Sequence, residues 1–392
     1  MILKWLFSRT VRHALQMRKH VWKLLQHQRD ILSPQAIEAV NKGMDALRAT
    51  CAAGDKAAVQ AGMDELEKVA NKWLRPYPNS GVRENVEVLL VAIAVAMGIR
   101  TFFLQPFKIP TGSMQPTLWG IHTDVLPPDF QIPNRVARFF EYWISGTSYE
   151  HVVAKAPGAF DGVEPPTRLA LFNLKQRFQV GNETYTLWFP ADSVLENLSR
   201  PTLERGSYWQ NDNGSYKQFN TGDDILKLRV VSGDHLFVDR LTYNFRRPER
   251  GEIVVFETKH VVHSDVPKDQ FYIKRLVGLS DEKLKIDKDR HLEVNRGAGW
   301  QQLTASTPHF ANLYGPDTDT YAPNHYFRHQ PMGLFANEQT FDVPPNQYIV
   351  MGDNTKNSLD SRYWGSFPNS DVVGKAYFVY WPISSRFGWG YR

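Results

Sequence analysis

Two residues of this 392-residue sequence have side chains suited to nucleophilic catalysis, Ser113 and Lys274. Ser113 lies in a segment that Pro110 and Pro116 stiffen, and Gly112 lets the backbone turn just before it. We therefore expect an exposed, rigidly held hydroxyl. Serine is a poor nucleophile at neutral pH and needs a base within hydrogen-bond reach. The sequence has no Gly-x-Ser-x-Gly elbow, and no His and Asp pair stands out among its 12 histidines, so Lys274 is the better candidate base.

Lys274 interrupts an otherwise apolar strand, Phe271–Val277, and must either point outward or be buried. The residues alone leave both orientations open. Burial among apolar neighbours would lower the pKa of the amine from ~10.4 by as much as ~3–5 units, and a neutral amine could then take the Ser113 proton. Strand alternation places Lys274 on one face with Tyr272 and Leu276, and Arg275 on the other with Ile273 and Val277.

Short strands are the elements that must position these residues. After Pro106 the sequence runs in short alternating stretches cut by Gly, Pro, Asn and Asp, which is the pattern of an antiparallel β protein. Helical periodicity is weak in this part, so we expect a mainly β fold. The predicted strands are Tyr185–Phe189, Leu226–Val231, Asp234–Arg240, Gly251–Thr258, Gln270–Leu279, Glu282–Asp287, Gln347–Gly352 and Lys375–Tyr380.

Four segments, read together and in this order, carry a family resemblance. They are Phe107–Leu118, Ser232–Arg240, Tyr272–Gly278 and Met351–Gly365, and they follow an apolar stretch. They resemble the signature boxes of bacterial type I signal peptidases, membrane-anchored serine proteases that remove signal peptides from exported proteins. The resemblance covers roughly residues 84–119, 232–280 and 341–382.

The resemblance implies roles for individual residues. It makes Ser113 the nucleophile and places the general base at Lys274, which favours the buried orientation of that lysine. It assigns the oxyanion hole to the Ser113 backbone N–H and to the Thr111 hydroxyl, where many relatives have serine. It also gives Ser358 the task of orienting the lysine.

The same resemblance assigns charged residues of the last box to structural ion pairs. Asp353, Asp360 and Arg362 match positions that hold the strands of the site together, with Arg275 as a further partner. The sequence departs from many relatives at Thr355 and Lys356, where these carry Arg-Asp. This departure concerns the local turn and its ion pairing rather than the Ser113 and Lys274 pair.

Substrate binding is implied by the resemblance as well. The positions that match shallow apolar pockets would accept small side chains one and three residues before the cut, so an Ala-x-Ala pattern fits. An extended peptide would pair with edge strands near Gln105–Ile109 and Phe271–Lys274. The pocket residues are Ile109, Met114, Leu118, Tyr272 and Ile273.

Charge divides the chain in two. Residues 1–83 hold 14 Lys and Arg against 7 Asp and Glu, a net charge of +7. Since the whole chain carries +5, residues 84–392 carry −2, and all the positive excess is N-terminal. The first region has helix-forming stretches, Ala36–Ala49 and Ala57–Leu74, and its basic start is either solvated or in contact with anionic lipid. The mean hydropathy of −0.42 excludes a protein with several membrane spans, and a single cysteine excludes a disulfide framework.

A single membrane anchor remains compatible with these averages. The uncharged run Val88–Ile99 has 12 residues, which as a helix reach only ~18 Å against a ~30 Å hydrocarbon layer, so a buried helix is one reading. Counted from Val88 to Phe107, with Arg100 snorkelling, the segment is long enough to span. The positive-inside rule then keeps the basic N-terminal region cytoplasmic and puts the catalytic part on the external or periplasmic side of a bacterial plasma (inner) membrane.

These observations give an expected fold and division of the chain. We expect a signal-peptidase-type coiled antiparallel β-sheet with one transmembrane helix and a helical cytoplasmic region. The division is a basic helical region at 1–83, an anchor at 84–105, a catalytic β core at 106–119, 232–280 and 341–392, a large insertion of unknown role at 120–231, and a second β insertion domain at 281–340. The expected partners are signal peptides of exported preproteins, the lipid bilayer and the protein-export machinery.

Several other sequence patterns could form binding sites. His260 with His263, and His325 with His329, have spacings that could hold a metal, but no carboxylate completes a motif, so we expect neither metal nor cofactor. We interpret Arg246–Arg250 as a turn rather than as a phosphate-binding site. The net charge of −2 on residues 84–392 argues against an extended nucleic-acid-binding surface. The aromatic run Ser384–Arg392, with Trp381, either packs or dips into lipid. Two rival functions stay open: a maturation peptidase for one export system, and a catalytically silent membrane-tethered β scaffold.

Overall fold

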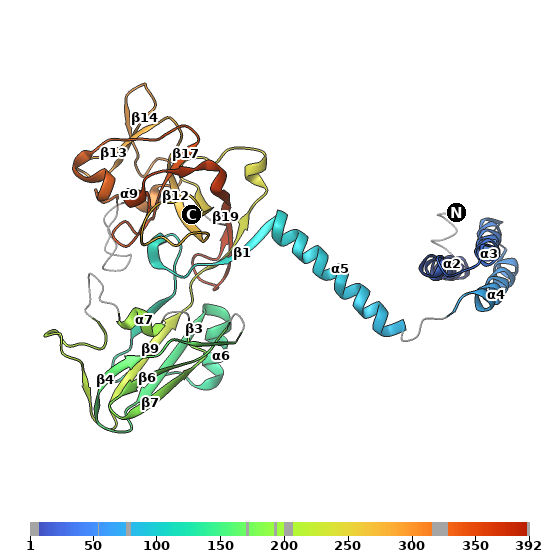
Figure 1. Cartoon of the computed structure of the whole chain (residues 1–392), viewed down its shortest axis with the longest axis horizontal. Helices are drawn as coiled ribbons and strands as arrows, with labels where there is room; N and C mark the ends of the chain where they lie inside the picture. Colours follow the sequence, from blue (N-terminus) through green and yellow to red (C-terminus); the bar gives the residue numbers. More distant parts are fainter. Residues whose placement is uncertain are drawn as a thin grey trace. The chain divides into compact units, whose positions relative to one another are not determined.

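The structure is a computed structural model that describes residues 8–53, 55–75, 80–169, 172–191, 194–199, 207–315 and 328–389. Two compact units divide the chain, Met1–Val95 and Ala96–Arg392. The first is helical, and the second is built of antiparallel sheets (Figure 1).

In the described part of the N-terminal unit, α2 (Arg9–Gln28), α3 (Pro34–Ala53) and α4 (Lys56–Trp73) pack together. The predicted helical stretches at Ala36–Ala49 and Ala57–Leu74 are confirmed within α3 and α4. Each helix buries an apolar stripe at three- and four-residue spacing, and these stripes form one core. The core residues include Val11, Leu25, Leu47, Cys51 and Leu66.

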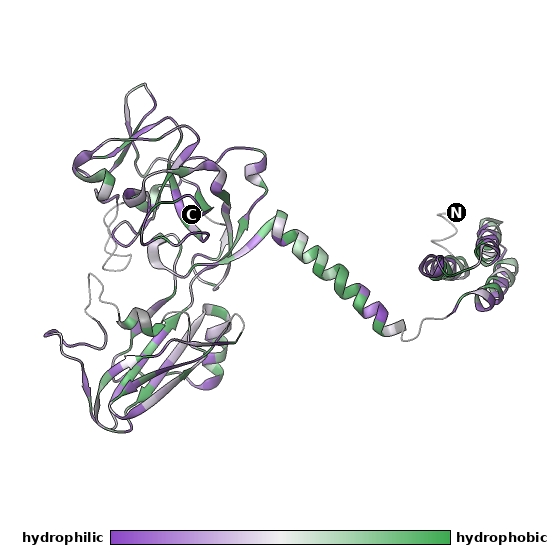
Figure 2. Cartoon of the chain, in the orientation of Figure 1, coloured by the Kyte–Doolittle hydropathy of each residue, from purple (hydrophilic) through white to green (hydrophobic). Residues whose placement is uncertain are grey.

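The apolar segment forms the helix α5 (Ser80–Phe102), which has 23 residues and a length of ~34 Å. Among the described residues, it supplies the one helix long and apolar enough to cross a membrane, and the apolar stretch is not buried by the protein. Figure 2 shows hydrophobic residues along most of this helix. The sequence analysis counted the membrane segment as far as Phe107, but the helix ends at Phe102. Leu104–Phe107 belongs to a strand, because Pro106 disfavours helix and the backbone pairs with another strand instead. The helix gains its length at the other end, where Arg83 pairs with Glu87.

An eight-stranded antiparallel sheet forms the centre of the second unit. Its strand order is β1 (Leu104–Lys108), β10 (His235–Asp239), β19 (Val372–Trp381), β11 (Ile253–Glu257), β12 (Phe271–Gly278), β17 (Gln347–Met351) and β18 (Phe367–Pro368), with β20 (Gly388–Trp389) beside β19. Register shifts in the pairs β10·β19, β11·β19 and β12·β17 curl the sheet. The strands predicted at Asp234–Arg240, Gly251–Thr258, Gln270–Leu279, Gln347–Gly352 and Lys375–Tyr380 are all confirmed in it.

The described part of residues 120–231 forms two sheets of its own. The chain enters and leaves this region through the smaller of them. In this sheet β2 (His122–Val125) and β3 (Thr147–Val153) both pair with β9 (Asp224–Val231). A second sheet holds β4 (Gly158–Val163), β5 (Thr167–Leu169), β6 (Phe172–Val180), β7 (Glu183–Trp188) and β8 (Gln218–Phe219), and α7 (Val194–Ser199) follows β7. A buried aromatic and aliphatic core joins the two sheets.

The helix α6 (Arg135–Ser145) contradicts the expectation that helical periodicity is weak after Pro106. Its apolar residues are mostly aromatic, a composition that favours strands and hides the helical spacing. The signals that could have revealed the helix are its ends. Asn134 caps the first turn through a hydrogen bond from the Ala137 N–H, and Gly146 ends the helix with φ of 67°.

A further sheet contains β13 (Lys283–Ile286), β14 (Leu292–Asn295), β15 (Trp300–Gln302) and β16 (Phe341–Asp342). It confirms the strand predicted at Glu282–Asp287. The short helix α8 (Ala311–Tyr314) and the 3₁₀ segment Gly333–Glu338 pack with it, and its core is continuous with the Val277 and Met351 side chains of the central sheet. This contact links the sheet to the strand that carries Lys274.

Candidate active site

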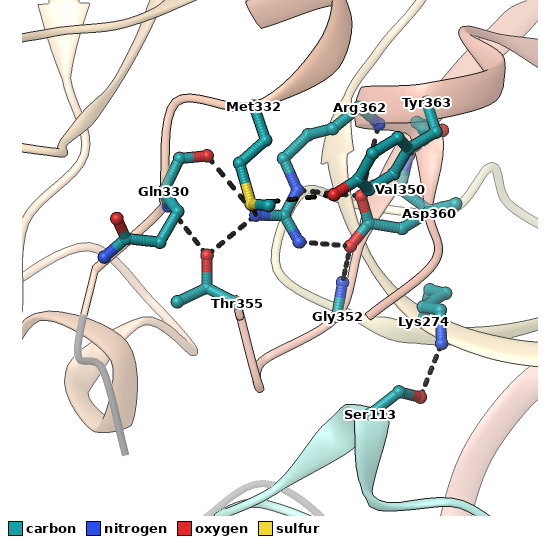
Figure 3. Close-up of polar contacts among 11 residues, drawn as sticks. Ser113, Lys274, Gln330, Met332, Val350, Gly352, Thr355, Asp360, Arg362 and Tyr363 are labelled. Carbon is teal, nitrogen blue, oxygen red and sulfur yellow. Dashed lines mark hydrogen bonds and ion pairs between the residues drawn. The ribbon is translucent and has the colours of Figure 1, made fainter. Parts of the chain in front are cut away.

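Ser113 and Lys274 face one another in the second unit. The Lys274 Nζ donates a hydrogen bond to the Ser113 Oγ at 2.5 Å (Figure 3). Ser113 lies in a 3₁₀ helix of one turn, Gly112–Met114, which follows β1. Lys274 lies in the middle of β12. The two residues are 161 positions apart in sequence, and the fold brings them into contact.

Lys274 is buried, with 4% of its surface exposed. Burial lowers the pKa of the amine to about 8, and the negative charge of Asp360 opposes this shift in part. Among the described residues no carboxylate lies within ion-pair distance of its Nζ. The Tyr272 ring, 5.8 Å from the Nζ, covers the amine from the same strand face. A substantial fraction of this lysine is therefore neutral close to physiological pH.

The turn that carries Ser113 is held by backbone contacts. The Asn354 N–H donates to the Ser113 carbonyl oxygen at 3.0 Å, and the Asn354 side-chain amide donates to the Gly112 carbonyl oxygen at 3.1 Å. Gly352 passes so close that a Cβ there would collide with the Ser358 side chain and the Ser113 carbonyl oxygen. Ser113 is only 8% exposed, so the expectation of an exposed hydroxyl is wrong: packing of the turn against the sheet covers it.

Arg275, the neighbour of Lys274, makes the first predicted ion pair. Its Nε and Nη2 donate to the two oxygens of Asp353 at 2.7 and 2.5 Å, and both side chains are buried. The Thr117 hydroxyl donates to the same carboxylate at 2.5 Å. The Arg275 Nη1 donates to the carbonyl oxygens of Gly251 and His309. This cluster ties the serine segment, β12 and the final box together.

Asp360 and Arg362 make the second pair, in a fork with two hydrogen bonds of 2.8 Å (Figure 3). Burial would raise the pKa of Asp360, but the Arg362 guanidinium holds it below its usual range. The departure at Thr355 is accommodated here, because the Thr355 hydroxyl accepts from the Arg362 Nη1 at 2.9 Å and from the Gln330 N–H at 2.7 Å. A neutral hydroxyl therefore serves as the hydrogen-bond partner of Arg362 in this turn.

Two predicted accessory hydroxyls lie near the pair without completing their expected contacts. The Thr111 Oγ1 is 3.5 Å from the Ser113 Oγ, a long contact. The Ser358 hydroxyl is buried and has no partner by hydrogen-bond geometry among the described residues, although it is close enough to Asp360 to help lower the pKa of that carboxyl. In this structure Ser358 makes no hydrogen bond to Lys274.

The five predicted pocket residues gather around the pair but differ in exposure. Ile109, Met114 and Leu118 are almost fully buried in a core cluster with residues of β10 and β11. Tyr272 and Ile273 are half-buried. The first three therefore form the base of the site in this structure rather than an open surface.

The strand edges available to a peptide match the predicted ones. β1 is the terminal strand of the central sheet. On β12, Phe271–Lys274 pairs with β11 on one side, while β17 pairs only from Arg275 onward. In the described part of the chain, both segments thus have an unpaired strand edge near the Ser113 hydroxyl.

The other candidate sites have structural partners. His260 lies 2.8 Å from Asp371, and the buried His329 lies 2.7 Å from the Tyr314 hydroxyl. His325 is outside the described residues, and no cluster of metal-binding side chains occurs within them. Arg246 pairs with Glu252, and Arg250 pairs with Glu282, which supports the interpretation of this segment as a turn.

Sequence reasoning missed Asn354, Thr117 and the favourable role of Thr355. Asn354 and Thr117 are small polar residues whose contacts depend on how two distant loops meet. The available signal was the position of Asn354 directly after Gly352 and Asp353 in the last box.

Comparison with known proteins agrees with this site. The family model for signal peptidase, peptidase S26, matches residues 82–130 and 227–381, which include Ser113, Lys274 and the final box. The unmatched stretch 131–226 contains α6 and most of the insertion.

Individual relatives agree with the family model. A probable signal peptidase I-2 of Synechocystis sp. is 32% identical over 150 residues, 38% of this chain and 56% of that protein. A signal peptidase I of Pseudomonas fluorescens is 31% identical, covering 44% and 65%, and one of Haemophilus influenzae is 24% identical, covering 79% and 75%. The chain thus spans less than two thirds of the length of the first two of these relatives.

Among solved structures, a signal peptidase I from Enterococcus faecalis is similar at 24% identity, with 33% of this chain and 97% of that chain covered and a TM-score of 0.24. That score is too low to support a conclusion about the fold. The family match rests on sequence, spans more than half of the chain and includes the residues of the site. The chain therefore belongs to the signal peptidase family, peptidase S26.

Proposed function

We propose that this protein is a membrane-anchored signal peptidase I, an endopeptidase that cleaves N-terminal signal peptides from exported preproteins. The observation that carries the proposal is the 2.5 Å contact between the Ser113 Oγ and the buried Lys274 Nζ. A neutral lysine at this distance is a base within reach of the serine proton. The family match supports the reaction class independently of the geometry.

In the proposed mechanism the neutral Lys274 amine takes the Ser113 proton as the Oγ attacks the scissile carbonyl carbon. The resulting ammonium then protonates the leaving amine, and the acyl-enzyme is hydrolysed by water with Lys274 again acting as base. The Ser113 backbone N–H and the Thr111 hydroxyl stabilise the oxyanion. The 3.5 Å distance between the two hydroxyls supports this proposed role of Thr111.

The remaining charged residues act as positioning residues. Arg275 with Asp353, and Arg362 with Asp360, fix the loops on either side of Lys274. We propose that Ser358 orients the amine once substrate has bound, since its buried hydroxyl has no other hydrogen bond in the described part of the chain.

The proposed substrate is an extended peptide with small residues one and three positions before the cut. Its main chain would pair with the unpaired edges of β1 and of Phe271–Lys274. Ile109, Met114 and Leu118 close the base of the pockets and Tyr272 and Ile273 line their rim. In this proposal the packed side chains leave room for alanine and exclude leucine.

We propose that α5 is a single transmembrane anchor in a bacterial plasma membrane. Apolar side chains are exposed around its whole circumference, including Val88, Leu90, Val91 and Ile93, which lipid would cover. Residues 1–83, which carry +7, would be cytoplasmic, and the β-rich unit would be external. In this proposal 1–83 is the cytoplasmic region, 120–231 an insertion, 281–340 a second β domain, and the export machinery a further partner.

The test is cleavage of a preprotein in detergent by the wild type, Ser113→Ala and Lys274→Ala. We expect each variant to lose at least ~10³-fold in kcat/KM, because the two residues act as one unit. Ser264→Ala and Lys259→Ala, at exposed positions of one loop, are matched controls and should keep full activity. Equal activity in all five proteins would refute the mechanism. An inactive wild type with a good substrate would favour a silent scaffold, and processing of one preprotein among several unrelated ones would favour a specialised maturation peptidase.

A further inference from the structure

The helix α6 packs on its own domain with its polar side. Its least exposed positions are Ala137, Glu141 and Ser145, which repeat every four residues and therefore share one face. Five large apolar side chains on the other sides of the helix are 49 to 67% exposed, and one of them, Phe139, also lines a groove with Thr147 and Ser148 of β3. They are Val136, Phe139, Phe140, Trp143 and Ile144, and we call them the α6 face. A helix of a globular domain normally buries this stripe, so the arrangement is inverted.

The α6 face continues onto the C-terminal segment. The Trp381 Nε1 donates to the Trp143 carbonyl oxygen at 2.8 Å, and the Ile383 N–H donates to the Ile144 carbonyl oxygen at 2.8 Å. Ile383 itself is 56% exposed. The helix is thus fixed against the end of β19, and the apolar surface crosses from one segment to the other. Exposed apolar surfaces made by several side chains mark sites that contact a partner or a membrane.

Positive charge lies beside the α6 face. A groove of about 330 Å³ is lined by Arg135, Arg138, Phe139, Tyr142, Thr147 and Ser148. Two guanidinium groups and the three hydroxyls of Tyr142, Thr147 and Ser148, at the margin of an aromatic stripe, match the chemistry of a phospholipid headgroup region. Helices that lie in a membrane interface combine an aromatic and aliphatic face with Lys or Arg on its border.

The place of α6 in the fold also favours a bilayer. The last residues of α5 run directly into β1, and the Arg240 N–H donates to the Phe103 carbonyl oxygen. The other end of β1 pairs with His235, which pairs in turn with Trp381, the residue in contact with α6. One five-residue strand, ~17 Å long, thus separates the end of the apolar helix from the region of α6.

We propose that α6 is an interfacial helix that lies on the lipid bilayer, with the α6 face among the acyl chains and Arg135 and Arg138 at the phosphates. The proposal rests on the membrane anchor given under the proposed function. It assigns a role to the part of the insertion that the family model does not match. Two attachments, α5 and α6, would hold the site at a fixed height and orientation above the bilayer.

The test uses spin labels on the full chain in vesicles of phosphatidylethanolamine and phosphatidylglycerol. Cys51, the single cysteine, is replaced by alanine, and one cysteine is introduced per protein: Phe140→Cys on the α6 face, Asp212→Cys on an exposed turn of the same insertion, or Leu90→Cys on α5. Collision with oxygen, which concentrates in acyl chains, is compared with collision with a water-soluble nickel complex. Peptide cleavage in detergent verifies that each labelled protein is folded.

We expect the label at 140 to collide with oxygen and to be protected from nickel, as the label at 90 is, while the label at 212 shows the reverse. A label at 140 that behaves like the one at 212, with 90 still in lipid, overturns the interfacial helix and leaves the anchor intact. Protection of 140 from both reagents also overturns it, since that result indicates a second protein copy on the α6 face. Exposure of 90 to nickel refutes the anchor itself.

Discussion

Lys274 and Arg275 are consecutive residues of β12, and both are almost completely buried, yet they meet different partners. Arg275 is neutralised by Asp353 in a fork of two hydrogen bonds, whereas Lys274 contacts the Ser113 hydroxyl. Strand alternation places the two side chains on opposite faces of β12. Arg275 can therefore hold the site together, while Lys274 stays basic and has no carboxylate partner in the described part of the chain. This division makes the following predictions specific to each residue.

The pH dependence of cleavage should reflect Lys274. Because burial lowers the pKa of its amine to about 8, kcat/KM should rise with pH through about 8 as the amine loses its proton. Asp360→Asn removes a negative charge that opposes this shift, so the acidic limb of the profile should move to lower pH in the fraction that folds. Initial rates on a soluble peptide over a pH series measure the acidic limb in the wild type and in Asp360→Asn. An acidic limb at the same pH in both proteins would contradict the assigned effect of Asp360 on the Lys274 pKa.

The buried lysine should reduce the stability of the folded protein at neutral pH. Its pKa is about 8 when folded against an ordinary 10.5, so below pH 8 the folded state carries a buried charge that the unfolded chain solvates. Lys274→Met should therefore abolish activity but raise the free energy of unfolding at pH 7 by up to about 3 kcal/mol. The gain should shrink as pH rises from 8 to 10.5, which chemical denaturation in detergent at several pH values can follow. A pH-independent difference would show that packing causes it.

Removing one partner of the Arg275 pair should have the opposite effect. Asp353→Asn leaves a buried guanidinium without its counter-charge and should cost about 3–5 kcal/mol of unfolding free energy. Asp342→Asn is the matched control, because its pair with Lys283 is exposed and should contribute little. Similar losses in both variants would show that the Asp353 charge is not essential to the site.

The Thr111 hydroxyl should matter for the rate and little for substrate binding. Thr111→Val keeps the shape of the side chain but removes the oxyanion donor, so kcat should fall ~10²–10³-fold while KM changes little. Thr111→Ser should restore most of the rate. If KM rises instead and serine does not rescue the rate, Thr111 acts through packing of the turn.

The proposed orientation, which rests on the charge asymmetry of the chain, can be tested directly. In sealed vesicles whose interior corresponds to the cytoplasm, added protease should digest the β-rich unit and leave residues before α5 protected. Antibody tags at the two ends of the chain report which part survives. Digestion of the N-terminal unit alone would reverse the assigned topology.

Much of the fold can be predicted from sequence because it depends on local pattern, whereas the burial of Lys274 against Ser113 is favoured only by the family resemblance. The strand that carries Lys274 is recognisable by its alternation, and Ser113 by its proline-flanked turn. The helix α6 escaped because aromatic residues dominate its stripe and because that stripe faces away from the core, against the usual expectation. The contacts of Asn354 and Thr117 could not be foreseen, since they form only when loops more than two hundred residues apart are folded together.

The strand pair β2 and β9 has a consequence for how such a protein can vary. The chain enters the insertion at His122 and leaves it at Val231, and these two residues are direct partners in the register. More than a hundred residues thus begin and end at neighbouring points of the backbone. A gene could gain, lose or exchange this module by altering one hairpin connection, while the strands that carry Ser113 and Lys274 keep their course. The insertion is therefore a natural place for lineages to diversify an otherwise constrained enzyme.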